Sequence, residues 1–173
     1  GGAGNANTGA SASGVSGWVS SGGRWYLKDS SGRNLTGWQK VGGTWYYMDA
    51  SGVMLTGWQK VGGTWYYLKS SGAMAKGWYK VGGKWYYSKS SGAMQANRWI
   101  GNYYVTGSGA MATGWVKVGG KDYYLRPSSG IMVTGKQTIG GKVYTFDGSG
   151  ALVVNTTPRW VKSGGAWYLR SPE

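Results

Sequence analysis

The residues that offer the most chemistry are aromatic: the chain contains 12 Trp and 14 Tyr but only one Phe. One set of Trp recurs every 20 residues: Trp18, Trp38, Trp58 and Trp78. A second set keeps the same interval: Trp25, Trp45, Trp65 and Trp85. The face of an aromatic ring carries a negative quadrupole, so several rings around one cavity attract a cation that lacks hydrogen-bond donors, above all a quaternary methylammonium group. The spacing therefore predicts binding pockets built from rings.

The side chains needed for most catalysis are scarce. The chain has no Cys and no His, which excludes disulfides, thiolate or imidazole metal sites, and nucleophiles that depend on a His base. The five carboxylates are Asp29, Asp49, Asp122, Asp147 and Glu173. They lie far apart in the sequence, which disfavours a hydrolase with paired carboxylates. We expect a chain that is not an enzyme and that has no cofactor and no metal.

The elements that must position the rings are short and repeated. One unit spans residues 36–55, and the next unit is nearly the same. Each unit has two β-prone runs joined by Gly-Gly, the two-residue connection that favours a type I′ or II′ hairpin turn. Leu, Ile, Val and Phe are too few for a conventional aliphatic core, whereas a stack of aromatic rungs is easily built. The sequence predicts an all-β fold, a solenoid of stacked β-hairpins from repeats of about 20 residues.

The turn position fixes the register of each hairpin. With Gly42-Gly43 as the loop, the predicted cross-strand pairs are Val41–Thr44, Lys40–Trp45, Gln39–Tyr46 and Trp38–Tyr47. Trp38 and Trp45 then share one face of the hairpin, and Tyr46 lies on the other. If consecutive hairpins stack with unlike faces together, two Trp of one repeat meet the first Tyr of the next. The expected product is a cage with three aromatic walls.

These motifs resemble a known family. Gly37-Trp38, Gly43-Thr44-Trp45-Tyr46-Tyr47 and Ser51-Gly52-Val53-Met54 are similar to the choline-binding repeats, also called cell-wall-binding repeats, of Gram-positive surface proteins and lytic enzymes. The resemblance covers about residues 17–170. It implies a β-hairpin solenoid that anchors its protein to phosphocholine on teichoic or lipoteichoic acid, and a secreted protein of the bacterial cell surface or cell wall. It also implies that each site uses two Trp from one hairpin and a Tyr from the next.

Carried over to this chain, the resemblance implies four complete cages. The predicted sets are Trp18, Trp25 and Tyr46; Trp38, Trp45 and Tyr66; Trp58, Trp65 and Tyr86; and Trp78, Trp85 and Tyr103. Met54, Met74 and Met94 are candidates for additional walls, although the hairpin register does not place them.

The last four of about eight repeats diverge from the pattern. The fifth retains only two walls, Trp99 and Tyr123, so we expect a weak site or none. In the sixth, Asp122 replaces the second Trp and faces Lys117 across the strands, which predicts an ion pair and leaves Trp115 without its usual partner. The seventh has no ring on the face that carries Trp elsewhere and is closer to the related glucan-binding repeats. The eighth has Trp160 and Trp167 with no hairpin after them, which leaves a capping unit, an open half-site or packing on a partner chain as alternatives.

Charge and the N-terminal segment add expectations about partners. The formal net charge is +14, which attracts anionic polymers. We expect no nucleic acid partner because the rings face neighbouring hairpins rather than an open groove, and no membrane insertion because no run of 18 apolar residues occurs. Residues 1–16, rich in Gly, Ser and Ala, are expected to be a flexible linker from an upstream domain to a module over 17–173.

Three functions remain open from the residues. The first is a noncatalytic module that binds choline in the cell wall, which can belong to a larger cell-wall hydrolase. The second is a module that binds glucan or another carbohydrate, since Trp also stacks on sugars. The third is a structural adhesin stalk whose rings are all core. A homodimer through the end repeats is a further expectation from the resemblance.

Overall fold

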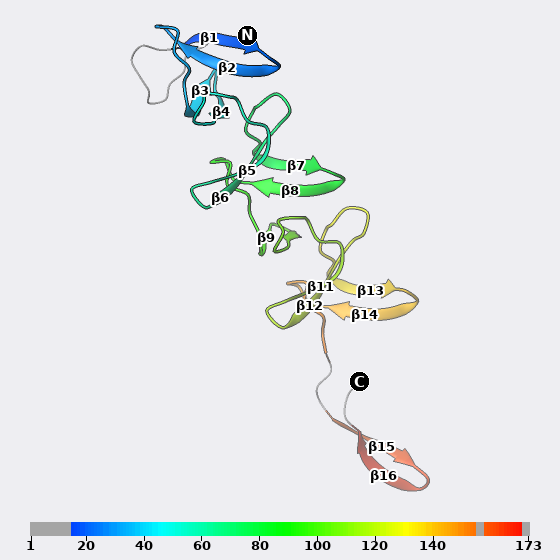
Figure 1. Cartoon of the computed structure of the whole chain (residues 1–173). Helices are drawn as coiled ribbons and strands as arrows, with labels where there is room; N and C mark the ends of the chain where they lie inside the picture. Colours follow the sequence, from blue (N-terminus) through cyan, green and yellow to red (C-terminus); the bar gives the residue numbers. More distant parts are fainter. Residues whose placement is uncertain (1–14, 155–157, 171–173) are drawn as a thin grey trace. The chain divides into compact units, whose positions relative to one another are not determined.

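The computed structural model describes residues 15–154 and 158–170. Over these ranges the chain is all-β, and sixteen strands form eight two-stranded sheets, each a hairpin of consecutive strands (Figure 1). The predicted fold class is therefore confirmed. The predicted linker over residues 1–16 lies almost entirely outside the described residues. The first strand begins at Val15, two residues before the predicted start of the module, because the Val15 backbone pairs with Asp29.

Most strands of the eight hairpins have 5 residues, whereas β1 and β2 are longer and β9 and β10 are shorter. The first four hairpins are β1 (Val15–Ser21) with β2 (Arg24–Asp29), β3 (Gly37–Val41) with β4 (Thr44–Met48), β5 (Gly57–Val61) with β6 (Thr64–Leu68), and β7 (Gly77–Val81) with β8 (Lys84–Ser88). The remaining hairpins are β9 (Arg98–Ile100) with β10 (Tyr103–Val105), β11 (Gly114–Val118) with β12 (Lys121–Leu125), β13 (Gly135–Ile139) with β14 (Lys142–Phe146), and β15 (Arg159–Ser163) with β16 (Ala166–Arg170).

The Gly-Gly pairs close the hairpins as predicted. Gly42 and Gly43 have φ angles of 59° and 81°, as a type I′ turn requires. Residues other than Gly rarely adopt such values. The observed register pairs Val41 with Thr44 and Trp38 with Tyr47, which confirms the predicted pairing. Two Trp side chains therefore share one face of the hairpin in each of the first four repeats.

The chain divides into two compact units, the first comprising residues up to Arg98 with Val105–Met111, the second comprising Trp99–Tyr104 with residues from Ala112 onward. Within each unit, the link that follows a hairpin hydrogen-bonds to the preceding hairpin. In the first unit, Met54 N donates to Trp25 O at 2.8 Å, and Leu55 N donates to Tyr47 O at 2.9 Å. In the second unit, Met132 N donates to Asn102 O at 2.9 Å. Each link thus ties two successive hairpins together, which is the arrangement of a hairpin solenoid.

Small cores lie between the hairpins. In the first unit Leu27, Val41 and Met48 are buried together, with Trp18 and Tyr46 packed against them. In the second unit Tyr104, Ala112 and Leu125 form the corresponding cluster. The aliphatic core per repeat is thus only a few side chains, and rings complete it, as the composition predicts.

In the hairpin of β7 and β8, the larger side chain lies on the first strand and the smaller one on the second, at positions where the two preceding hairpins have a Gln and a large aliphatic residue. Tyr79 stands where the second and third hairpins have Gln39 and Gln59, and Ser88 stands where they have Met48 and Leu68. The Tyr79 hydroxyl and Ser88 Oγ share a buried hydrogen bond of 2.7 Å. Burial raises the pKa of the Tyr79 phenol, so it stays protonated at neutral pH.

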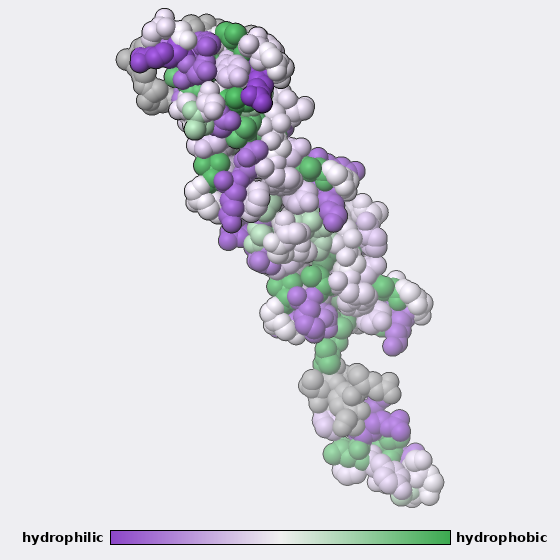
Figure 2. Space-filling model, in the orientation of Figure 1, coloured by the Kyte–Doolittle hydropathy of each residue, from purple (hydrophilic) through white to green (hydrophobic). Residues whose placement is uncertain are grey.

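The outer surface is mostly of intermediate hydropathy. Figure 2 shows a largely pale face with scattered purple, hydrophilic groups on the hairpins, because Gly, Ser, Trp and Tyr all have intermediate values. Among the described residues, no helix is long and apolar enough to cross a membrane.

Candidate functional site

The second predicted cage is an open pocket between consecutive hairpins. Trp38, Trp45, Tyr66, Met74 and Ser91 line a cavity of about 340 Å³. The Trp38 and Trp45 rings stand almost perpendicular, at 88°, with their centroids 6.4 Å apart. Tyr66, from the next hairpin, meets Trp38 edge to face at 4.8 Å. The three rings therefore form walls around a space rather than a closed stack.

Each wall comes from a different part of the fold. Trp38 lies on β3 and Trp45 on β4, diagonally across the strand pair on one hairpin face, whereas Tyr66 lies on β6 of the next hairpin. Met74 lies on the link after β6, and its backbone N donates to Trp45 O at 2.9 Å. This hydrogen bond ties the link to the second Trp of the preceding repeat, and Met74 lines the same pocket. The thioether is an adaptable apolar wall.

The same contacts recur at the first and third predicted cages. Trp18 meets Tyr46 at 4.9 Å, and Trp58 meets Tyr86 at 4.9 Å, both edge to face. The link hydrogen bond recurs too, because Met94 N donates to Trp65 O at 2.9 Å. Three of the predicted ring sets thus share the contact between the first Trp and the next Tyr, and the link hydrogen bond to the second Trp. The residue that sequence reasoning left unplaced, the Met of each link, has the same position in all three.

The fourth predicted cage joins residues of different units. Trp78 and Trp85 belong to the first unit, whereas Tyr103 belongs to the second. Trp78 packs against Tyr87 of its own hairpin at 5.1 Å, and Met111 N donates to Trp85 O at 2.8 Å, so the hairpin and link contacts of the other cages recur here. The closure of this cage by Tyr103 stays a prediction.

The electrostatics of the cages favour cations through ring faces alone. The residues that line the Trp38 pocket carry no charge. Lys40 lies across the strand from Trp45, with Nζ 5.8 Å from the ring centroid, and Lys60 and Trp65 repeat this contact at 5.9 Å. The second indole of these hairpins thus already attracts an ammonium group of the protein. A ligand that uses the same ring needs no carboxylate partner.

The divergent repeats behave as their residues predict. Trp99 and Tyr123 meet edge to face at 4.9 Å. Lys117 Nζ lies 3.2 Å from Asp122 Oδ1, which confirms the predicted cross-strand ion pair. Trp115 still meets the Tyr of the following hairpin, Tyr144, at 5.0 Å. The contact between first Trp and next Tyr therefore persists where no second Trp exists.

The last hairpin leaves its rings in solvent. Trp160 and Trp167 are 64% and 61% exposed, and Tyr168 and Leu169 are exposed to a similar degree. Lys162 Nζ lies 5.8 Å from the Trp167 ring centroid, as in the complete repeats. The hairpin has both Trp of a cage.

Met74, one of the candidate walls from the sequence, lines this pocket, whereas Ser91 and the path of the link escaped sequence reasoning. Ser91 lies on the link after β8, two hairpins beyond the one that carries Trp38 and Trp45, a separation that the 20-residue pattern does not indicate. The Met of each link forms an isolated bridge with the last residue of its own hairpin, as Met54 does with Met48. The recurrence of Ser-Gly-x-Met in the sequence indicated that the Met has a structural role, but not which hairpin its backbone would pair with.

Among the described residues, no group of three or more acidic side chains lies close enough to hold a metal ion.

Family models match nearly the whole of the repeat region. A model described as a choline-binding repeat matches residues 55–99 and 112–156, and a second of the same description matches residues 93–116. A model described as a putative cell wall binding repeat matches residues 16–33 and 36–54. The comparison with curated proteins found no match.

Solved structures of choline-binding proteins are similar to this chain. CbpJ from Streptococcus pneumoniae is 42% identical with a TM-score of 0.76, over 86% of this chain and 54% of that one. Choline binding protein F from the same species, solved with a peptidoglycan analogue, is 46% identical with a TM-score of 0.74, over 82% and 53%. The choline-binding domain of pneumococcal CbpL is 31% identical with a TM-score of 0.57, over 90% and 93%. The chain thus spans about half the length of the first two and nearly all of the third. By its repeats and by these matches, the chain belongs to the choline-binding repeat family.

Proposed function

We propose that this chain is a noncatalytic module that anchors its protein to the cell wall by binding choline headgroups of teichoic or lipoteichoic acid. The observation that carries the proposal is the pocket lined by Trp38, Trp45, Tyr66 and Met74. It presents ring faces from two repeats and a thioether, and no charged side chain. A trimethylammonium group needs such a surface, because it is a cation that cannot donate hydrogen bonds.

A comparison within the chain supports a ligand role for the second Trp. The hairpin of β11 and β12 has Asp122 in place of that Trp, yet it keeps the hairpin register and the contact between Trp115 and Tyr144. The contact between these successive hairpins therefore does not need the second Trp. Trp25, Trp65 and Trp85 nevertheless recur at that position and are 44%, 42% and 40% exposed. A large exposed ring repeated at the same position of successive hairpins supports a ligand role there.

Repetition converts weak sites into an anchor. A desolvated cation–π contact contributes about 2 kcal/mol, and association costs several kcal/mol, so one cage is expected to bind choline at roughly millimolar strength. Several cages that engage one polymer with repeated headgroups raise the effective concentration, and avidity can exceed the affinity of one site by about 10² to 10⁴. Elution of the chain from a quaternary-amine resin by free choline tests this directly.

The decisive experiment is a choline titration followed by Trp fluorescence, with glucan oligomers as the competing ligand class. Saturation by choline and not by glucan supports the proposal, and the reverse result supports the carbohydrate module. Trp45→Ala is the matched variant, because it removes one wall from the best-defined pocket while leaving the Trp38–Tyr66 contact in place. Choline should also raise the melting temperature, since ligand at 100 times its dissociation constant stabilises by about 2.7 kcal/mol. An unchanged melting temperature would favour the structural stalk.

The basic surface has a separate role in the proposal. The lysines that follow Gly-Trp, among them Lys40 and Lys60, are exposed, and the chain carries a formal charge of +14. We infer that they attract the phosphodiester backbone of the polymer while the rings select its headgroup. Raised salt should then weaken polymer binding and leave binding of free choline nearly unchanged. Equal loss for both ligands would contradict this division of labour.

The proposal extends to location and assembly. A cell-wall anchor implies a secreted protein at the bacterial surface, in which this module accompanies another domain, for example a cell-wall hydrolase. The exposed Trp160 and Trp167 of the last hairpin are the proposed contact with a second copy of the chain. Analytical ultracentrifugation of Trp160→Ser/Trp167→Ser against the natural chain tests that contact.

A further inference from the structure

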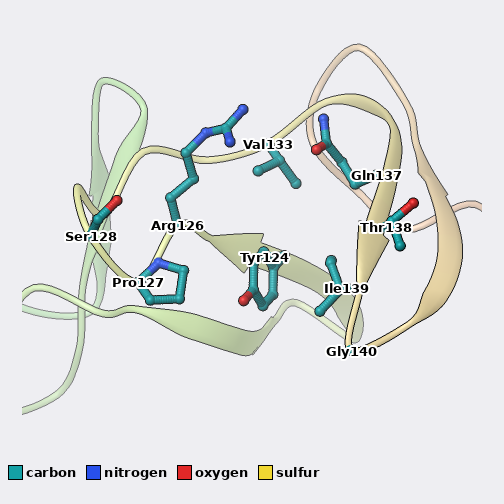
Figure 3. A pocket seen from close by; sticks show the side chains of 9 residues that line it. All are labelled: Tyr124, Arg126, Pro127, Ser128, Val133, Gln137, Thr138, Ile139 and Gly140. Atoms are coloured by element: carbon teal, nitrogen blue, oxygen red, sulfur yellow. The ribbon is translucent and has the colours of Figure 1, made fainter.

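A second pocket, of about 280 Å³, lies in the second unit and contains no Trp (Figure 3). It is formed by β12, the link after it, and β13. Its lining joins apolar groups of Tyr124, Pro127, Val133 and Ile139 to the polar side chains Arg126, Ser128, Gln137 and Thr138. Several convergent polar groups beside one aromatic ring suit a polar ligand with an apolar face.

The apolar part of the lining is held in place by contacts outside the pocket. The Tyr124 ring packs edge to face on Trp115, with centroids 5.2 Å apart. Val133 is only 3% exposed, and its backbone N donates to Tyr124 O at 3.0 Å. The phenol ring therefore has a fixed orientation before any ligand arrives, which lowers the entropic cost of binding.

Part of the polar lining lies on a longer link. Residues 126–134 connect these strands, one residue more than residues 49–56, which connect β4 and β5. Gly130 N donates to Arg126 O at 2.7 Å, and Arg126 N donates to Ile131 O at 2.9 Å, so the backbone of Arg126 is fixed within this longer turn. On β13, Gln137 Nε2 donates to Thr134 O at 2.9 Å, which orients the amide and leaves its Oε1 as an acceptor at the pocket.

This pocket favours an anionic ligand, whereas the cages favour a cation. Its lining includes the Arg126 guanidinium and no carboxylate. A guanidinium repels a quaternary ammonium and binds phosphate through paired N–H donors. The ligand of this pocket is therefore not choline but a group that carries an anion beside an apolar ring face.

We propose that this pocket binds one phosphorylated sugar unit. The C–H face of the sugar ring packs on Tyr124 and Pro127, the phosphate accepts hydrogen bonds from Arg126, and a sugar hydroxyl donates to Gln137 Oε1. The volume, close to the lower end of the range of about 300 to 1,000 Å³ for small-molecule sites, suits a single hexose-sized unit. The site uses no residue of the choline cages, so it stands or falls independently of choline binding.

The test is an NMR titration of the ¹⁵N-labelled chain with glucose 6-phosphate, with glucose and inorganic phosphate as separate arms. The expected result is saturable shifts of the Gln137 side-chain amide and of the backbone amides of Thr138 and Gly140, with the indole N–H signals of the cages unchanged. Arg126→Met should weaken binding by about tenfold or more, since it removes a charge-assisted pair. Arg126→Lys, which keeps the charge but loses the planar fork, should have an intermediate effect.

Lys142→Met is the matched control, because Lys142 is an exposed cation on β14 that does not line the pocket. Equal weakening by Lys142→Met and Arg126→Met would overturn the proposal, because it would show general charge attraction. Binding of inorganic phosphate or of glucose as tight as that of glucose 6-phosphate would also overturn it. So would the absence of saturation at concentrations of ligand that saturate the choline cages. Preserved dispersion of the variant spectra would show that each variant is folded.

Discussion

The second and sixth hairpins have the same backbone and differ at one decisive side chain. In β3–β4, Lys40 faces Trp45, and its Nζ lies 5.8 Å from the ring centroid. In β11–β12, Lys117 faces Asp122, and its Nζ lies 3.2 Å from Asp122 Oδ1. Both hairpins nevertheless pack a Trp against a Tyr of the following hairpin, at 4.8 and 5.0 Å. The strand register is also the same.

This comparison separates two roles of the aromatic residues, the packing of successive repeats and the proposed binding of a ligand. The first Trp and the following Tyr hold successive repeats together, since they are kept where the cage is lost. The sixth hairpin has Asp in place of the second Trp and keeps the same register, so we attribute the second Trp of the first four repeats to the proposed ligand. Variants that exchange these residues either break or sharpen this division.

The largest effect is expected from Trp58→Ala, which removes a ring that has both roles. Trp58 contacts Tyr67 and Tyr86, each at 4.9 Å. We expect the loss of one choline site and of about 3 kcal/mol in the free energy of unfolding, the lower end for large aromatic residues because Trp58 is only half-buried. Urea unfolding and calorimetric stoichiometry measure the two effects. Unchanged stoichiometry would show that this cage does not bind choline.

Trp65→Ala should remove the site and spare the fold. Trp65 is 42% exposed, so its truncation is expected to cost less than about 1 kcal/mol in stability. Choline stoichiometry should fall by one, as for Trp58→Ala. If Trp65→Ala instead destabilised the chain as much as Trp58→Ala does, the second Trp would be part of the core and the comparison between hairpins would fail.

The reverse exchange, Asp122→Trp, should create a site. The new indole would stand beside Trp115 and Tyr144, and Leu152 N already donates to the backbone O of residue 122 at 2.8 Å, as Met74 N does to Trp45 O. We expect one additional weak choline site and a loss of only a few tenths of a kcal/mol from the exposed ion pair. Asp122→Ala serves as the control that breaks the ion pair without adding a ring. A stoichiometry equal to that of the natural chain would mean that walls alone are insufficient.

The smallest effect is expected from an Asp that begins the turn after a hairpin in each compact unit. Asp29 in the first unit and Asp147 in the second each accept backbone N–H groups of the following turn. The hydrogen bond from the Arg33 backbone is the main cause that lowers the pKa of Asp29, and the Ser149 hydroxyl is the main cause for Asp147. A lowered pKa stabilises the fold above the ordinary Asp pKa of about 3.9, and this contribution is lost as pH falls through the folded-state pKa.

The pair Asp29→Asn/Asp147→Asn should therefore lower the melting temperature slightly at neutral pH. It should also flatten the decline in melting temperature below about pH 4 relative to the natural chain. Choline stoichiometry should not change. A decline in the double variant as steep as in the natural chain would assign the acid sensitivity to other groups.

Much of the fold follows from the sequence because each step is local. The Gly42-Gly43 pair fixes the turn, the turn fixes the cross-strand partners, and the partners fix which rings share a face. The Lys117–Asp122 ion pair follows from the same reasoning. The repeat interval then predicts the neighbours, because the same hairpin recurs.

The rest depends on side chains outside the strand ladders. Met74 and Ser91 reach the Trp38 pocket from links, whose paths no strand periodicity describes. Tyr79 and Ser88 conserve the volume of a core position by exchanging large and small side chains between strands, and neither substitution reveals the other in the sequence. The pocket beside Tyr124 combines residues of two strands and of the link that carries Arg126, and only the folded chain brings these together.

The measurement that tests the central claim most directly is a crystal structure of the chain grown with choline. The account predicts a trimethylammonium group within about 6 Å of the ring centroids of Trp38, Trp45 and Tyr66, with Met74 beside it. Rings that close onto one another at saturating choline, or choline bound only away from them, would contradict it.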